Sequence, residues 1–118
     1  MKLIDTSILY EIISERETDV IRNSFILDLT IYEFGNAVWK QHKFFGIPKK
    51  ECVGLIENFS KLGLRIIRIN LNDLTEITEV AIKQGITVYD ASYIFYAKKH
   101  SLELLTSDEK MKKAWEAK

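Results

Sequence analysis

The apolar residues of this chain fall into short runs that are separated by longer amphipathic stretches. Runs such as residues 2–4 and 65–69 have the length of single buried strands, whereas the stretches between them carry apolar residues at helical spacing. Strands that alternate with helices build a parallel sheet, because each helix returns the chain across one face of that sheet. The pattern therefore predicts an α/β fold with three layers, α/β/α, around a mostly parallel central sheet.

The ends of the expected elements are marked by capping and turn residues. Strands are predicted at residues 2–4, 25–29, 65–69 and 102–105. Helix starts are predicted at Asp5, Thr30, Pro48, Asn72 and Thr87. Helix ends are predicted at Gly46, Gly63 and Gly85, because glycine adopts the left-handed conformation that often follows a helix. Residues 106–108 are expected to lead into a charged terminal helix.

The chain has 118 residues, the size of one ordinary domain. Hydrophobic residues make up 47% and charged residues 29%, a balance that is typical of a folded protein rather than a disordered one. No internal repeat or linker is visible, so residues 1–118 are interpreted as a single domain.

The single cysteine, Cys52, cannot form a disulfide within the chain, which fits a reducing compartment, and we expect it to be a small buried apolar residue. The first residues carry too short an apolar run for a signal peptide and reach a charge at Asp5. No apolar run approaches the roughly 18 residues of a membrane span. We therefore expect a cytoplasmic protein with no membrane segment.

Lysine and arginine together number 17, as do aspartate and glutamate, so the formal net charge is zero. The whole chain thus lacks the basic character that marks many nucleic-acid-binding proteins. A neutral total is equally compatible with an acidic pocket surrounded by basic patches. Net charge therefore neither supports nor excludes a nucleic-acid substrate.

Four carboxylates fall where ligands bind in parallel α/β proteins, beyond the carboxyl ends of the strands. Asp5 ends the first predicted strand, and Asp108 follows the fourth. Glu33 lies in the first turn after the second strand, and Asp90 in the first turn of a later helix. These four side chains are far apart in sequence, and the fold predicts that they meet at one edge of the sheet.

Carboxylates gathered within a few ångströms repel one another, which raises their pKa values unless a cation is bound. Oxygen ligands of this kind suit Mg²⁺ or Mn²⁺. Zinc is disfavoured, because its usual cysteine and histidine ligands are missing in any workable spacing. The two histidines, His42 and His100, are expected to be solvated surface residues.

A purely structural explanation exists for each acidic residue taken alone. Acidic side chains are favoured at helix N-termini by the helix dipole, and Asp5 and Asp108 have the positions of simple caps. Thr30 and Glu33 have the spacing of a capping box, in which Glu33 would bond back to the backbone of Thr30. The coincidence of four such residues on one side of the sheet favours a metal site.

At these residues the sequence resembles the PIN domain, and specifically the VapC-type toxin ribonucleases of toxin–antitoxin pairs. The matching segments are Leu-Ile-Asp-Thr-Ser at 3–7, Glu-Phe-Gly-Asn at 33–36, Val-Tyr-Asp-Ala-Ser-Tyr at 88–93 and Leu-Leu-Thr-Ser-Asp at 104–108. Each motif alone is weak, but together they occur in order over nearly the whole chain. Family members usually carry a further short strand after the helix that follows the last aspartate, and we expect this chain to lack it.

The resemblance implies a metal-dependent endoribonuclease that leaves a 5′-phosphate and a 3′-hydroxyl. It implies that Asp5, Glu33, Asp90 and Asp108 hold Mg²⁺ or Mn²⁺ and carry the catalysis, with Thr6, Asn36 and Thr106 in support. Asn36 would orient ligands from one helical turn beyond Glu33. The implied partners are an RNA substrate, a cognate antitoxin and a second copy in a homodimer. The alternative is a PIN-like module that binds RNA or protein without cutting.

Basic and aromatic residues are candidates for binding these partners. An acidic pocket needs lysines for the RNA backbone, and the candidates are Lys40, Lys43, Lys49, Lys50, Lys110, Lys112 and Lys113. Trp39, Phe44 and Phe45 lie beside the first lysine group, and at least one of them is expected in the core. Any that are exposed would suit a groove for an antitoxin helix or a dimer contact.

Three other protein classes fit the sequence less well. A haloacid-dehalogenase-like phosphatase needs a second aspartate where this chain has Ser7. A response-regulator receiver domain needs paired acids at the first strand, and Asp5 has no such neighbour. A nucleoside triphosphatase needs a glycine-rich phosphate loop, and none is present.

Overall fold

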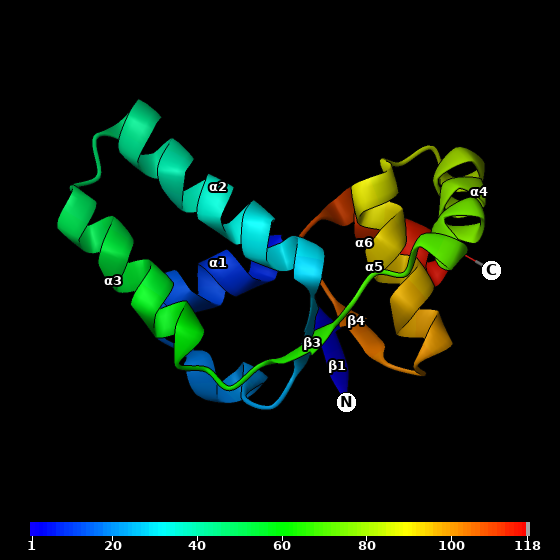
Figure 1. Cartoon of the computed structure of the whole chain (residues 1–118), viewed down its shortest axis with the longest axis horizontal. Coiled ribbons are helices and arrows are strands. Elements are labelled where there is room, and N and C mark those ends of the chain that lie inside the picture. Colours follow the sequence, from blue (N-terminus) through cyan, green and yellow to red (C-terminus); the bar gives the residue numbers. More distant parts are fainter. Residues whose placement is uncertain (118) are drawn as a thin grey trace.

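The structure, a computed structural model, describes residues 1–117. Its centre is a four-stranded sheet in the order β3-β2-β1-β4 (Figure 1). The strands are β1 (Lys2–Ile4), β2 (Phe25–Leu27), β3 (Arg65–Ile67) and β4 (Glu103–Leu105). All three neighbouring pairs are parallel. The predicted fold class is therefore confirmed, and the sheet is entirely parallel in the described residues.

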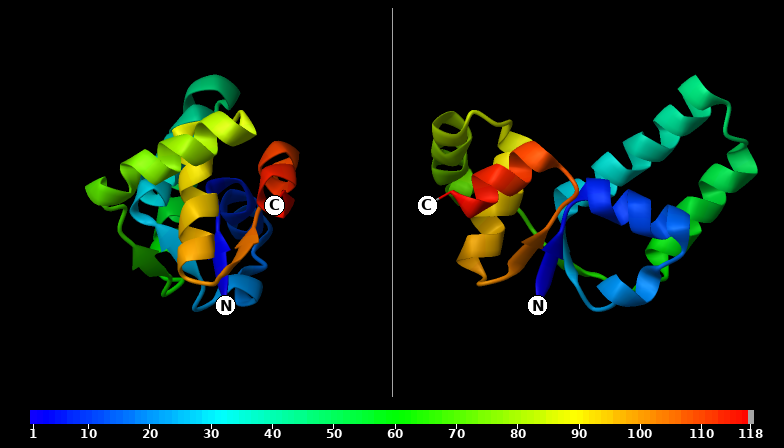
Figure 2. Two further views of the ribbon diagram at one scale, coloured as in Figure 1. Left: turned by 90° about the vertical axis from the view of Figure 1, so that its right-hand side faces the viewer. Right: turned by 180° about the vertical axis from the view of Figure 1, so that it is seen from behind.

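Helices cover both faces of this sheet, as Figures 1 and 2 show. One layer consists of α1 (Thr6–Glu15), α2 (Asp28–Phe45) and α3 (Lys49–Ser60), with the 3₁₀ turn η1 (Thr18–Ile21). The other layer consists of α4 (Leu74–Gln84), α5 (Val88–Lys99) and α6 (Glu109–Glu116), and the 3₁₀ turn η2 (Leu71–Asp73) directly precedes α4.

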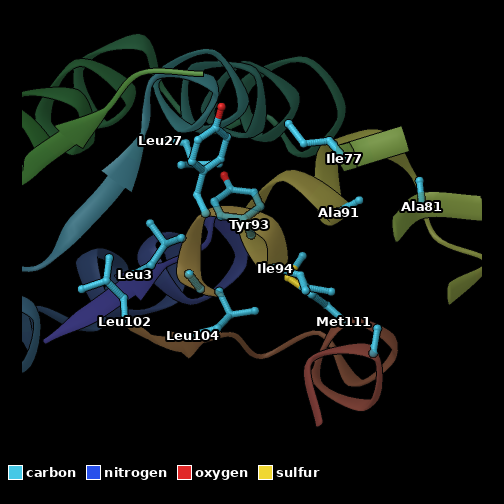
Figure 3. Packing of buried hydrophobic residues seen from close by; sticks show 13 residues of the cluster. Leu3, Leu27, Ile77, Ala81, Ala91, Tyr93, Ile94, Leu102, Leu104 and Met111 are labelled. Carbon is cyan, nitrogen blue, oxygen red and sulfur yellow. The ribbon is translucent and has the colours of Figure 1, made fainter. Parts of the chain in front are cut away.

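The strands bury side chains on both faces, because successive residues of a strand point in opposite directions. In β1, Leu3 packs into the core beneath α4, α5 and α6, whereas Ile4 packs into the core beneath α1, α2 and α3. Figure 3 shows the first of these cores, with Leu3 and Leu104 from the sheet facing Ile94 of α5. Strands that are apolar on both faces explain why the strand segments read as continuous apolar runs.

The order of the strands places a topological switch point at β1. The chain moves outward from β1 to β2 and β3 and then returns to add β4 on the other side of β1. The connections from β1 and β4 therefore leave the sheet toward opposite faces and open a crevice at the carboxyl ends of these strands. Asp5 follows β1 and Thr106 follows β4 at this crevice.

Two predicted strands end earlier than expected, at a place where the side chain of Asp28 bonds the backbone, and the predicted fourth strand begins one residue later, at Glu103. The strand predicted to reach residue 29 ends at Leu27, and α2 begins at Asp28. Oδ1 of Asp28 accepts from the backbone N–H of Leu29, and Oδ2 accepts from that of Ile69. This bond to Ile69 lies outside the strand ladder, and β3 ends at Ile67.

Two predicted caps also differ from those observed. Asn70, rather than Asn72, is a capping residue, and it caps η2, since its side chain accepts from the backbone N–H of Asn72. The N-cap of α4 itself is Asp73, whose side chain makes no capping bond. The helix predicted to end at Gly63 ends at Ser60, although Gly63 does adopt a positive φ of 65° two residues after the C-cap. Thr87 caps α5 and Gly85 caps α4 as predicted.

Helices α2 and α3 form an antiparallel hairpin that extends away from the sheet (Figure 1). Trp39, Phe44 and Phe45 lie at its end and are 52%, 65% and 71% exposed, so the expectation that at least one belongs to the core is wrong. The buried residues of α2 are Thr30, Phe34 and Val38, which follow one another at helical spacing in the part of the helix nearer the sheet. We call the three exposed aromatics the hairpin tip.

The remaining expectations concern single residues and membrane segments. His42 and His100 are exposed, as predicted, whereas Cys52 is only half-buried at the edge of a core. Within residues 1–117, no helix is long and apolar enough to cross a membrane.

Candidate functional site

Asp5 is buried at the carboxyl end of β1, with only 2% of its surface exposed. Its Oδ1 accepts hydrogen bonds from the backbone N–H of Ile8 at 3.1 Å and from Ser7 Oγ at 2.7 Å. The predicted cap is therefore present. Its other oxygen, Oδ2, accepts from Thr106 Oγ1. One oxygen of Asp5 thus caps the N-terminus of α1, and the other is bonded to Thr106 at the end of β4.

The segment after β4 joins this carboxylate through Thr106. The Oγ1 of Thr106 also accepts from the backbone N–H of Asp108 at 3.0 Å. Asp108 is exposed and caps α6, since its Oδ1 accepts from the backbone N–H of Met111 at 2.9 Å. Both aspartates are therefore real caps, and their helix N-termini lie side by side at the crevice.

Glu33 does not form the predicted capping box. Its Oε1 accepts instead from Thr6 Oγ1 at 2.9 Å and from the Tyr93 hydroxyl at 2.7 Å. One bond of this kind is made instead by Thr30, which is the third residue of α2 and whose Oγ1 accepts from the backbone N–H of Leu27, the N-cap. Glu33 is thereby turned toward the start of α1 and α5.

Asp90 lies in the first turn of α5 and is half-buried. Its pKa is raised, first by burial and then by the negative charges of Asp108, Glu33 and Asp5, while Lys110 acts in the opposite direction. These three charges act on Asp90 from the starts of α6, α2 and α1. The structure thus brings the four predicted carboxylates into one electrostatic neighbourhood.

This neighbourhood carries an excess of negative charge. The salt bridges of residues 1–117 are Arg22–Asp19 and Lys99–Asp73, and neither involves the four carboxylates. Carboxylate and hydroxyl oxygens are the ligands that Mg²⁺ and Mn²⁺ prefer, so the donor set fits such an ion. In the described part of the chain, however, no three acidic, histidine or cysteine side chains lie close enough to hold one metal ion as they stand.

The other predicted residues take different places. Thr6 belongs to the site through its bond to Glu33. Asn36 is exposed on α2, and its side chain makes no hydrogen bond to residues 1–117. The seven candidate lysines are exposed. Lys110 is near enough to Asp90 to oppose, in part, the rise in the pKa of that carboxyl.

Two residues of the site were not singled out from the sequence. Tyr93 stands three positions after Asp90, a spacing that puts both on one helix face, yet a tyrosine in an apolar stretch looks like a core residue. Ser7 follows the cap of α1, and its Oγ both donates to Asp5 and accepts from the backbone N–H of Ser107. The pKa of Tyr93 is strongly raised, chiefly by burial.

A parallel sheet with helices on both faces and four carboxylates at its switch point defines an α/β protein with an acidic site. Residues 2–116 match the model of the PIN domain, and the chain belongs to this family.

The relatives carry the assignment further. The chain is 31% identical to a protein named exonuclease VapC9 from Pyrobaculum aerophilum over 92% of its own length and 81% of the relative's. It is 28% identical to ribonuclease VapC3 of the same organism over 83% of its length and 76% of the relative's. The crystal structure of PAE2754 from P. aerophilum superposes with a TM-score of 0.83 at 29% identity, covering 98% of this chain and 86% of that one. The predicted resemblance to VapC-type PIN proteins is confirmed.

Proposed function

We propose that this protein is a metal-dependent endoribonuclease of the VapC type that hydrolyses phosphodiester bonds of RNA. The observation that carries the proposal is the gathering of four carboxylates where α1, α2, α5 and α6 begin, joined by the bonds of Thr106 to Asp5 and of Thr6 to Glu33. The pKa of Asp90 is raised accordingly, first by burial and then by the charges of the other three. A cluster of unpaired negative charge costs folding free energy, and a site that binds a cation explains why the chain retains it. The relatives' names, exonuclease and ribonuclease, support a nuclease.

In this proposal Asp5, Glu33, Asp90 and Asp108 would hold Mg²⁺ or Mn²⁺. A bound ion of this kind supplies an activated water and offsets the charge that develops on the phosphate. Hydrolysis adds the hydroxyl of water to phosphorus and its proton to the 3′ oxygen, which leaves a 5′-phosphate and a 3′-hydroxyl.

The chain's own hydroxyls would hold the carboxylates in place during this reaction. Thr106 and Ser7 each donate to one oxygen of Asp5, and Thr6 donates to Glu33. Such bonds orient metal ligands and typically change affinity or activity by about 10–100-fold when they are lost. Lys110, which already acts on Asp90, would help to bind the RNA backbone.

The proposal includes partners and a location. As a VapC-type toxin, the protein would pair with a cognate antitoxin, form a homodimer and act in the cytoplasm. The hairpin tip supports the protein partners in this proposal, because three neighbouring exposed aromatics are unusual on a surface that meets only water.

A specific observation favours a second candidate, a PIN-like module that binds RNA or protein without cutting. It is the spacing of the carboxylates, which in residues 1–117 do not converge on one ion position. The two candidates differ in their response to Mn²⁺. A site that binds the ion raises the temperature of unfolding as Mn²⁺ is added, whereas a module without a metal site shows no such rise.

A circular RNA tests the proposed activity most selectively, because it has no ends for an exonuclease to attack. The purified protein is incubated with a circular and a linear RNA of the same sequence in Mn²⁺, Mg²⁺ or EDTA. An endonuclease linearises the circle in the presence of metal and leaves 5′-phosphate ends. Degradation of the linear RNA alone would show an exonuclease, and no loss of either RNA would favour the binding module.

A further inference from the structure

A chain of hydrogen bonds links the end of β2 to the carboxylate of Glu33. The backbone N–H of Leu27 donates to Thr30 Oγ1 at 3.2 Å. Thr30 Oγ1 lies 2.8 Å from the hydroxyl oxygen of Tyr93, and that hydroxyl donates to Oε1 of Glu33 at 2.7 Å. Three segments of the chain, the starts of α2 and α5 and the end of β2, are joined by this network.

The direction of each bond follows from counting hydrogens. A carboxylate only accepts, so the single hydrogen of the Tyr93 hydroxyl is used on Glu33. The short contact between Thr30 and Tyr93 therefore requires the hydrogen of Thr30, which is free because Thr30 accepts from Leu27. The Tyr93 hydroxyl also lies 3.1 Å from Oγ1 of Thr6, a contact in which either atom could be the donor. Tyr93 and Thr6 both donate to Oε1 of Glu33, so the network ends on this carboxylate.

Burial makes these bonds hard to replace with water. Thr30 is fully buried and Tyr93 is 1% exposed, and Figure 3 shows Tyr93 within the core close to Leu27. When a buried donor loses its acceptor, water cannot replace that acceptor, and the unpaired donor costs stability. The position of the Tyr93 hydroxyl is thus fixed by the core, and Glu33 is fixed by Tyr93.

The two oxygens of Glu33 have different surroundings as a result. Oε1 accepts from both Tyr93 and Thr6. Oε2 has no hydrogen-bond partner in the part of the chain that the structure describes, although Glu33 is half-buried. Oε1 of Glu33 is therefore used in hydrogen bonds within the protein, whereas Oε2 can bind a ligand.

We infer that Tyr93, supported by Thr30, is a positioning residue that holds Glu33 ready to bind a divalent cation through its free oxygen. The inference rests on the proposed function, since it concerns the same site. It assigns to Tyr93 a role beyond core packing, because a phenylalanine ring would fill the same space without holding the carboxylate.

The test compares Tyr93→Phe with a matched control, Tyr96→Phe. Both remove one buried hydroxyl from α5, but the Tyr96 hydroxyl bonds Asp73 and the backbone of Asn70 rather than the site. Mn²⁺ affinity is measured by calorimetry at a temperature where circular dichroism shows each variant folded. We expect the Kd of Tyr93→Phe to rise by about tenfold and that of Tyr96→Phe to stay within twofold of wild type.

Equal Mn²⁺ affinity of wild type and Tyr93→Phe would overturn the inference while leaving the proposed function intact. The same weakening in Tyr96→Phe would also overturn it, because the effect would then belong to core stability. A wild-type protein that binds no Mn²⁺ and cuts no RNA would instead overturn the proposed function and this inference with it.

Thr30 supplies a second test if Tyr93→Phe fails to fold. Thr30→Val keeps the shape of the side chain but removes the hydroxyl that donates to Tyr93, whereas Thr30→Ser keeps that hydroxyl. We expect weaker Mn²⁺ binding in Thr30→Val and wild-type binding in Thr30→Ser. Equal Mn²⁺ affinities of Thr30→Val and Thr30→Ser would show that the hydroxyl of Thr30 does not support Tyr93.

Discussion

The hydroxyl of Thr106 donates to Oδ2 of Asp5, a residue 101 positions earlier in the chain. This bond connects the carboxyl ends of β4 and β1, the two strands on either side of the crevice. Because Asp5 is also the cap of α1, its carboxylate is held from two directions before any ligand arrives. The bond therefore gives a direct way to test whether the position of Asp5 matters for function.

Replacing Thr106 with valine should weaken the site more than it weakens the fold. Thr106→Val removes both the bond to Asp5 and the acceptor for the backbone N–H of Asp108. We expect RNA cleavage to fall by about tenfold or more, as is usual when a group that orients a metal ligand is lost. Thr106→Ser retains the hydroxyl and should cut within about twofold of wild type. Equal cleavage rates for the valine and serine variants would contradict this account.

Asp5→Asn should abolish cleavage while the protein remains folded. Asparagine caps helices about as well as aspartate, so the start of α1 is preserved. With the amide oxygen of asparagine at the capping position, its NH₂ group replaces Oδ2 and cannot accept from Thr106, which should cost about 1 kcal/mol of stability. Circular dichroism and thermal unfolding check the fold, and an end-labelled RNA checks cleavage. A folded Asp5→Asn protein that cuts like wild type would remove Asp5 from the proposed site.

The raised pKa of Asp90 predicts how stability depends on pH in the absence of metal. The folded state holds the Asp90 proton more tightly than the unfolded state, whose pKa is near the ordinary value of 3.8. Stability should therefore fall as the pH rises from about this value through the raised pKa, since the charged form is disfavoured in the folded protein. Asp90→Asn has no such charge and should lose less stability over the same range. The measurement is the unfolding temperature of both proteins in EDTA from pH 4 to 7. An identical dependence on pH in the two would contradict the raised pKa of Asp90.

Two phenylalanines of α2 should differ sharply in their effect on stability. Phe34 is fully buried and contacts the rings of Tyr10 and Phe59, so Phe34→Ala should cost about 3–5 kcal/mol. Phe45 belongs to the hairpin tip and is 71% exposed, so Phe45→Ala should change stability by no more than about 0.5 kcal/mol. Urea unfolding gives both values. A large loss of stability in Phe45→Ala would show that the hairpin tip is a part of the core.

The periodicity of the sequence was sufficient to predict the layers and the parallel sheet, because strands buried on both faces appear as short apolar runs. It did not predict where β2 and β3 end, since those ends depend on Asp28, which bonds the backbone of Ile69 from 41 positions away. A bond of that length in sequence leaves no local signal. The choice between Asn70 and Asn72 failed for another reason: both are asparagines, a residue type that caps helices, and they stand only two positions apart.

The four carboxylates were predicted from their places relative to the strands, and the structure brings them into one neighbourhood. Their surroundings were not predictable in the same way. Thr30 and Glu33 match a capping box in spacing, but Glu33 is held by Tyr93, a residue 60 positions later. Sequence spacing describes one helix at a time, whereas the site is made where several helices begin.

The most direct test of the central claim is cleavage of an end-labelled RNA pool by wild type and Asp90→Asn, each with Mn²⁺ and with EDTA. Asp19→Asn serves as the control, because Asp19 is an exposed acid paired with Arg22. The account predicts cutting by wild type and Asp19→Asn that requires Mn²⁺, and none by Asp90→Asn. Cutting in EDTA, or undiminished cutting by a folded Asp90→Asn protein, would contradict a metal-dependent site built on these carboxylates.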